Sequence, residues 1–191
     1  MTWKDALRQA QQQPVFTDRL KRRCQELQNL TLTFTQDYEK PLNEVRALGW
    51  LYPSDEELAS IMLHEHDQHL YTYSKHIHEQ LPYVTKLLQE NPNTRRAIIH
   101  LTDMQESKQH QHLPCMITVY AAIREEQLHL TTYARSIDLL IGLPANLYQS
   151  YVLAQAISKE LNTPLGSISF LINSAHIFKD YQKELHTILD A

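Results

Sequence analysis

The chemistry of this chain centres on a cysteine that follows a proline. Cys115 comes directly after Leu113-Pro114 and opens a run of β-forming residues. A cysteine in such a place is most often a small buried hydrophobe, and it becomes a nucleophile only where cations favour its thiolate. The role of Cys115 therefore depends on which positive charges the fold brings to it.

A second group of candidate residues lies where a strand is expected to end and a helix to begin. Arg135 and Ser136 could hold a phosphate through a guanidinium fork and a hydroxyl. Asn146 offers both a hydrogen-bond donor and an acceptor, which suits the amide-like edge of a base. A surface pair of Arg135 with Asp138, together with a helix-capping Asn146, explains the same residues equally well.

Three further residues are less informative on their own. Arg95 and Arg96 are adjacent at the start of an expected strand, so they point to opposite faces of the sheet. Arginines in such a place are ordinarily solvated surface charges. His176 lies near the end of a later strand, which alone indicates no chemistry.

The histidines form a cluster that could suggest a metal. Its members are His64, His66, His69, His76 and His78. His66 and His69 have the helical spacing of a chelating pair, but the HExxH motif is absent and His64 lies about 200° around the helix from His66. A solvated face is the favoured interpretation, and no metal is expected.

The elements that must position these residues follow from periodicity and turn signals. Helices are expected over residues 3–10, from Ser54 to about 69, and over 79–90, 146–161 and 179–189. Strands are expected over residues 29–35, 95–101, 116–123, 127–133 and 167–172. Ser54 and Glu57 form a capping box. Pro82 fits only the first turn of its helix, and residues 142–144 are expected to break the chain.

Composition sets the class of the protein. The chain has 191 residues, 42% hydrophobic and 21% charged, with a net charge of -4. These values predict one soluble globular domain of mixed α and β structure, with a sheet covered by helices. They make the chain a poor candidate for nucleic-acid binding, which needs a basic field. Only three glycines occur, so Gly-rich phosphate loops are absent. Without a membrane span or signal peptide, a cytoplasmic protein with free thiols is expected.

Taken in order, these segments resemble the thymidylate synthase family. The stretches that carry the resemblance are residues 91–96, Pro114-Cys115, residues 133–146 and residues 174–178, with Asp18-Arg19 and Tyr73-Ser74-Lys75 as weaker matches. The pattern Arg-Ser-x-Asp followed by Gly-x-Pro-x-Asn, downstream of Pro-Cys, is specific. The short archaeal members are the most similar.

The resemblance implies a single α/β (α+β) domain of the thymidylate synthase fold over residues 1–191, and covalent catalysis. Cys115 would add to C6 of a uracil nucleotide, and C5 would then take a one-carbon unit from 5,10-methylenetetrahydrofolate or a related methylene-pterin. Tyr73 would lie near this nucleophile. Cys24, in a charged stretch outside every matched motif, would have no such role.

Binding roles are implied residue by residue. The implied nucleotide ligands are Arg19, Arg95, Arg96, Arg135 and Ser136 at the phosphate, Asn146 at the pyrimidine edge and His176 at a sugar hydroxyl. Asp138 and Gly142 would contact the pterin. In the family the paired arginines come from the partner subunit, so a homodimer with shared active sites is implied. Together these guanidinium groups would lower the pKa of the Cys115 thiol.

Several positions depart from the family pattern. Met116 stands where a histidine is usual, Ala145 replaces an aromatic that lines the folate pocket, and Phe178 replaces a tyrosine that helps to hold the sugar. Asn173-Ser174 replaces Gly-Asp, and Glu44 is a candidate for the catalytic glutamate. Because Ala145 and an end at Ala191 suggest a more open pocket, two alternatives stay open: a nucleotide C5-hydroxymethylase, in which water captures the one-carbon unit, and a nucleotide-binding relative without transfer chemistry.

Overall fold

The fold is built on one six-stranded mixed sheet. A computed structural model describes residues 1–50, 52–64, 73–103, 108 and 113–191. The strand order is β1-β2-β6-β5-β4-β3, with every pair antiparallel except β5 and β6. The strands are β1 (Phe16–Thr17), β2 (Arg23–Phe34), β3 (Ile98–His100), β4 (Met116–Arg124), β5 (Gln127–Asp138) and β6 (Leu165–Phe178). The parallel pair is joined by a helical crossover, as parallel strands require.

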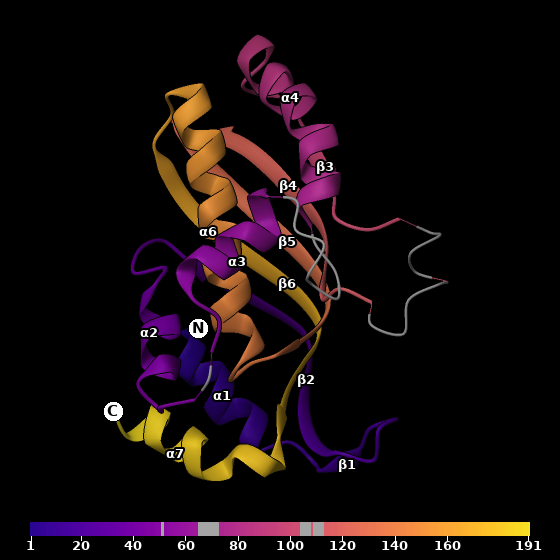
Figure 1. The fold of residues 1–191 in the computed structure, drawn as a ribbon, viewed down its shortest axis with the longest axis vertical. Coiled ribbons are helices and arrows are strands. Elements are labelled where there is room, and N and C mark those ends of the chain that lie inside the picture. Colours follow the sequence, from indigo (N-terminus) through magenta and orange to yellow (C-terminus); the bar gives the residue numbers. More distant parts are fainter. Residues whose placement is uncertain (51, 65–72, 104–107, 109–112) are drawn as a thin grey trace.

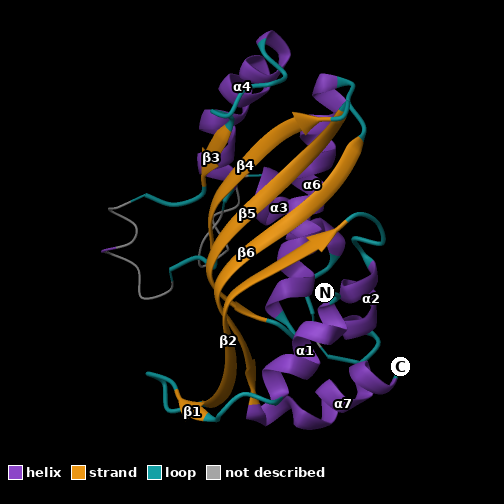
Figure 2. Ribbon diagram, turned by 180° about the vertical axis from the view of Figure 1, so that it is seen from behind, coloured by secondary structure: helices purple, strands orange, loops and turns teal. Residues whose placement is uncertain are grey.

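The helices gather on one side of this sheet (Figures 1 and 2). They are α1 (Trp3–Gln11), α2 (Lys40–Arg46), α3 (Asp55–Leu63), α4 (Ser74–Glu90), α6 (Gly142–Leu161) and α7 (Gln182–Asp190), with a short 3-10 turn η1 (Lys179–Tyr181). Helix α6 is the crossover between β5 and β6, and α1 and α7 lie side by side at the lower end. The opposite face of the sheet carries no helix among the described elements (Figure 2). The expected class, a mixed sheet with helical cover, is confirmed.

In the neighbouring strands β2, β6 and β5, the alternation of core-facing and outward-facing side chains is reversed at the same row of the sheet. Along β5 the buried positions run in steps of two up to Ala134 and resume at Ile137, and along β6 they run to Ile172 and resume at Ala175. The paired rows are the same, because Ala134 lies opposite Ile172 and Ile137 opposite Ala175. In β2, Asn29 has a left-handed backbone conformation at this level, with φ of 56°. A step of three in place of two moves every later side chain to the other face.

This change of face places the candidate site residues of β5 and β6 on the side of the strands that points away from the core. Beyond it, Ser136, Asp138 and His176 lie on the face opposite to the buried Ile137 and Ile177. Hydrophobic side chains thus keep facing α1 and α7, while polar side chains two positions apart become available to a ligand.

The sequence located most elements but misjudged several boundaries. Helix α4 begins at Ser74 and contains Pro82 in its interior, not in its first turn. The side chain of Gln80 compensates: its amide donates to the carbonyls of His76 and His100 and accepts from the His100 N–H, which fastens α4 to β3. Strands β2, β5 and β6 are longer than expected, and α2 and β1 were not predicted.

The expected break at residues 142–144 is also wrong. These residues form the first turn of α6, where Pro144 is tolerated because N–H groups in a first turn have no intrahelical partner. The capping box of Ser54 and Glu57 is confirmed, with both reciprocal hydrogen bonds present.

Helix α1 fixes the connection between β5 and α6. The indole N–H of the buried Trp3 donates to the carbonyl of Leu139 at 2.6 Å. Leu139 directly follows Asp138, so this hydrogen bond holds the segment that leads from the candidate site into α6. No helix within the described ranges is long and apolar enough to cross a bilayer.

Candidate active site

Cys115 lies immediately before β4 and is held from the side of β5. The guanidinium of Arg135 donates from Nε to the carbonyl of Pro114 at 3.0 Å and from Nη2 to the carbonyl of Leu113. The backbone N–H of Arg135 donates to the carbonyl of Cys115 at 3.0 Å. One residue of β5 therefore fixes three consecutive carbonyls around the thiol, which is itself half-buried.

The residue after the cysteine is fixed from two other elements. The Met116 N–H donates to the hydroxyl of the fully buried Tyr73 at 3.3 Å, so Tyr73 lies beside the residue that follows Cys115. The hydroxyl of Ser150, on α6, contacts the Met116 sulfur at 3.7 Å. Met116 is completely buried, so at this position the chain has a packing residue in place of the usual histidine.

Polar residues of β5 and β6 meet beside this segment. The Ser136 hydroxyl and the His176 ring nitrogen Nδ1 are 3.3 Å apart. One carboxylate oxygen of Asp138 accepts from the N–H groups of Leu140 and Ile141, and its other oxygen has no hydrogen-bond partner among the described residues. The predicted interpretation of Asp138 as a surface partner of Arg135 therefore does not hold.

Asn146 is buried in the second turn of α6 and does not cap the helix. Its amide Nδ2 donates to Gln149 at 3.0 Å, while its Oδ1 is buried without a hydrogen-bond partner in the part of the chain that the structure describes. Ser150 lies one turn further along α6, on the same face, and contacts Met116. A buried acceptor without a partner is costly, so the Asn146 Oδ1 is a candidate for hydrogen bonding to a ligand.

Three of the predicted phosphate arginines do not join this cluster in a single chain. Arg95 and Arg96 are exposed just before β3, near the end of β4 that is remote from Cys115, since Ala97 pairs with Ala121. At about 3.3 Å per residue, that places them roughly 20 Å along the strand from Met116. Arg19 is exposed in the turn between β1 and β2. Only Arg135 of the predicted arginines contacts the cysteine segment.

Comparison with known proteins shows the family to which the chain belongs. The family model for thymidylate synthase matches residues 14–190. The chain belongs to the thymidylate synthase family. It is 30% identical over 172 residues to a putative thymidylate synthase of Methanococcoides burtonii, covering 86% of this chain and 78% of that protein. It is 31% identical over 127 residues to the thymidylate synthase of Haloferax volcanii, covering 66% of this chain and 37% of that protein.

A solved structure agrees on the fold. The thymidylate synthase from T4 phage superposes with a TM-score of 0.77 at 19% identity, covering all of this chain and 80% of that one. Against several of the curated relatives the chain spans a third to a half of their length. The expected family and fold are confirmed by these matches.

The electrostatics of Cys115 differ from the expectation of a lowered thiol pKa. Burial raises the pKa of Cys115 above its usual value, and the Asp138 carboxylate raises it further, while the Arg135 guanidinium lowers it. Burial dominates because, among the described residues of a single chain, one cation and not four acts on the thiol. In a single chain the pKa of Cys115 is therefore raised and not lowered.

Asp138 and Gly142, the two residues that are predicted to contact the pterin, lie close together. A side chain at Gly142 would come within 3.6 Å of the Asp138 Cβ, an ordinary contact distance. Burial raises the pKa of Asp138, and the neighbouring His176 acts in the opposite direction. The structure thus brings both residues to the N-terminal turn of α6.

Two residues near the site were not singled out by the sequence. The Tyr52 hydroxyl donates to the Ile141 carbonyl, and burial raises the pKa of this phenol well above its usual range. Arg22 lies over the ring of Phe178 at 3.4 Å. Tyr52 had no signal beyond its place near Pro53, and Arg22 is one of four cations in residues 19–23, with nothing to distinguish it.

The remaining candidates lie away from this cluster or outside the described residues. Glu44, on α2, pairs with Lys4 of α1 at 3.0 Å and makes no described contact with the cysteine segment. His66 and His69 lie outside the described residues. In the described ranges no group of three His, Cys, Asp or Glu side chains could hold a metal ion.

The pKa pattern predicts how fast Cys115 is alkylated. In a Cys24→Ser background, the iodoacetamide reaction of Cys115 should accelerate with pH through an apparent pKa above the usual thiol value, because only the thiolate reacts. Arg135→Gln removes the cation that favours the thiolate, so it should raise this pKa and slow alkylation at pH 8. Arg124→Gln, an exposed arginine at the far end of β4, is the matched control and should leave the profile unchanged. An unchanged or faster reaction in Arg135→Gln would contradict this account.

Proposed function

We propose that this protein transfers a one-carbon unit to C5 of a uracil nucleotide, as in the conversion of dUMP to dTMP. The observation that carries the proposal is the buried Oδ1 of Asn146, which has no hydrogen-bond partner among the described residues. An amide oxygen accepts a hydrogen bond from the N3–H of uracil, whereas N3 of cytosine has no hydrogen to donate. Its neighbour Gln149 holds the amide so that this oxygen stays oriented. Membership of the thymidylate synthase family supports the same substrate class.

Cys115 is the proposed nucleophile. Its sulfur forms a bond to C6, and the electron pair of the C5–C6 double bond moves toward C5 and the O4 carbonyl, which makes C5 nucleophilic. After C5 has gained its substituent and lost its proton, the S–C6 bond breaks and the double bond re-forms. Arg135 contributes by holding the carbonyls of Leu113 and Pro114, so that the thiol has a fixed position relative to β5.

The donor side of the site fits a methylene-pterin. Asp138 is half-buried beside the first turn of α6, and one of its oxygens has no hydrogen-bond partner among the described residues. That oxygen can accept from the N–H groups of a pterin ring. The Tyr52 hydroxyl donates to the Ile141 carbonyl at the start of the same helix. When bound, the methylene-pterin would supply the one-carbon unit and, for a methyl product, also the hydride that reduces it, which leaves the pterin oxidised by two electrons.

A second outcome, hydroxymethyl transfer, is favoured by Ala145. This residue is partly exposed and presents only a methyl group where the family has an aromatic ring. A smaller wall admits water to the one-carbon unit, and hydride transfer needs water excluded. Whether the product carries a methyl or a hydroxymethyl group therefore depends on whether this wall excludes water. Cys115 and Asn146 have the same roles in both reactions.

The proposed active unit is a homodimer with shared sites. Arg95 and Arg96 are too far along β4 to reach the nucleotide in their own chain, and both are exposed. The helix-free face of the sheet carries large exposed apolar side chains, with Ile98 38%, Tyr133 44% and Leu171 44% exposed. A second copy packed on this face would cover them. It would also bring its own arginine pair to a phosphate held by Arg135 and Ser136.

The reaction is tested by the mass of the product. Incubation with dUMP and methylenetetrahydrofolate should give a nucleotide heavier by a methyl or a hydroxymethyl group, and Cys115→Ser should give neither. Cys24→Ser is the control and should retain the activity, because Cys24 is buried outside the site. Binding of dUMP with no change in its mass would leave a nucleotide-binding protein without transfer chemistry and would overturn the proposal.

Sharing of the site is tested by mixing two inactive variants. Arg96→Ala subunits lack the donated arginine, and Cys115→Ala subunits lack the nucleophile. After subunit exchange, half of the molecules are heterodimers with one intact site each, so about a quarter of the wild-type activity should return. Verified exchange without any recovery, or an active monomer in sedimentation experiments, would refute sharing.

A further inference from the structure

A pocket opens between α1 and α2, on the side of the sheet that carries the helices (Figures 1 and 2). Its volume is about 380 Å³, at the lower end of the range for small-molecule pockets. Among the described residues, none of those placed in the candidate active site lines it. The helix-free face lies on the opposite side of the sheet, so a second copy packed on that face leaves this pocket open.

The apolar part of the pocket wall consists of rings. Trp3 of α1, Phe34 at the end of β2 and Pro41 in the first turn of α2 all line it. Trp3 has a fixed orientation, because its indole N–H is bound to the carbonyl of Leu139. The Phe34 ring is held edge-on against that of Phe170, with centroids 6.5 Å apart. Rings that are fixed before binding favour a ligand with a flat apolar body.

The charged side chains of the wall divide into those that are engaged within the protein and two that are not. Lys4 and Glu44 form an ion pair at 3.0 Å, with only 24% and 20% of their side chains exposed, so they neutralise each other. Arg8 is engaged with groups outside the pocket wall. Lys40 and Asp37 are exposed, and neither forms an ion pair with another described residue. The pocket therefore offers one cation and one anion to a ligand.

We propose that this pocket binds an aromatic α-amino acid, in a site separate from that of the one-carbon reaction. The ring of the ligand lies against the aromatic part of the wall, its carboxylate pairs with Lys40, and its ammonium group pairs with Asp37. An aromatic anion or cation would leave one of these two residues without a partner, whereas a zwitterion satisfies both. Because both residues are exposed, the rings supply most of the affinity and the two charges supply selectivity. This inference does not depend on the proposed function.

Calorimetric titration of the wild type with L-phenylalanine tests the pocket. Saturable binding with a Kd of about 1 mM or lower is expected for a ligand of this size. L-alanine has the same charges without the ring and should bind more than about tenfold more weakly. An excess of dUMP should leave the binding of L-phenylalanine unchanged. Displacement by dUMP, or the absence of saturable binding, would overturn the inference, whereas binding of L-phenylalanine without any binding of dUMP would contradict the proposed function alone.

Two variants and two analogues separate the charge contacts. Lys40→Met should weaken L-phenylalanine roughly 3- to 5-fold, near the upper end for an exposed ion pair, and should not weaken phenylalaninamide, which lacks the carboxylate. Asp37→Asn should weaken L-phenylalanine similarly and should not weaken N-acetylphenylalanine, which lacks the ammonium group. Asparagine tolerates the left-handed backbone of residue 37, whose φ is 54°. Glu39→Gln, an exposed acid that does not line this pocket, is the matched control and should leave every affinity unchanged.

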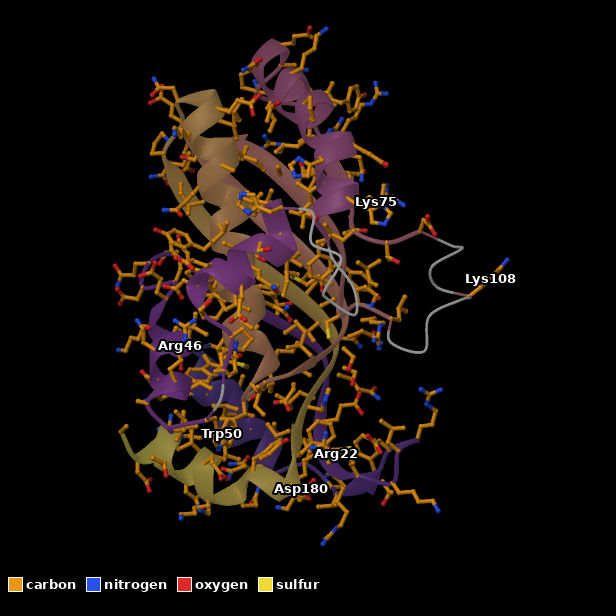
Figure 3. All side chains as sticks on the ribbon, viewed as in Figure 1. Arg22, Arg46, Trp50, Lys75, Lys108 and Asp180 are labelled. Carbon is orange, nitrogen blue, oxygen red and sulfur yellow. The ribbon has the colours of Figure 1, made fainter. Side chains whose placement is uncertain are left out.

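Tryptophan fluorescence locates the ligand. Trp3 lines the pocket, whereas Trp50, the other tryptophan, contacts the Tyr181 ring and lies below Arg46 in the view of Figure 3. In a Trp50→Phe background all tryptophan emission comes from Trp3. L-phenylalanine should change this emission with the same Kd that calorimetry gives. Saturable binding without any change in the emission would place the ligand elsewhere and overturn the inference.

The variants also decide whether the ligand is bound as a zwitterion. Equal weakening of all three aromatic ligands in Lys40→Met or Asp37→Asn would mean that the residue only supports the pocket, and no weakening would mean that it does not touch the ligand; either overturns the inference. Both residues are exposed, so we expect both variants to fold, which a thermal melt checks. The wild type gives an independent comparison, because both analogues should bind it more weakly than L-phenylalanine, and equal affinities would refute the inference.

Discussion

The guanidinium of Arg135 is the group on which the candidate site depends most. It binds two carbonyls of the segment that leads to Cys115, and the backbone N–H of the same residue binds a third. Among the described residues it is also the one cation that lowers the pKa of the Cys115 thiol, against a larger opposite effect of burial. Arg135 thus affects both the position and the pKa of the Cys115 thiol. For this reason its replacement affects both, and a conservative change such as Arg135→Gln is needed to examine the charge.

The central sheet prepares the rest of the site through one shared irregularity. Because β2, β5 and β6 change face at the same row, the polar side chains that follow can meet on one side while hydrophobic ones remain in the core. Ser136 and His176 come into contact in this way from neighbouring strands. A regular alternation would have placed both Ser136 and His176 on the core face, where Ala134 and Ile172 lie. The site therefore arises from the geometry of the sheet as much as from the residues themselves.

The sequence could identify the motifs but not the distances between them. The Pro-Cys, Arg-Ser-x-Asp and Gly-x-Pro-x-Asn motifs can be recognised from the spacing of their residues along the chain. Their residues Cys115, Arg135 and Asn146 lie in or near one cluster. Boundaries were missed where tertiary contacts outweigh local signals: Gln80 stabilises α4 around Pro82, and the first turn of α6 contains Pro144. The pKa of Cys115 could not be foreseen, because it depends on burial. Arg22 could not be distinguished from its neighbours, since only the structure shows that its guanidinium lies on Phe178.

The central claim is that Cys115 attacks C6 of a uracil nucleotide, and trapping the covalent intermediate tests it most directly. 5-Fluoro-dUMP with methylenetetrahydrofolate should leave an adduct that survives denaturation, because fluorine at C5 cannot leave as a proton. Peptide mass spectrometry should locate the adduct on the peptide that contains Pro114-Cys115-Met116. The adduct should be absent from Cys115→Ser and present in Cys24→Ser. An adduct on Cys24, or no adduct under conditions where 5-fluoro-dUMP binds, would contradict the account.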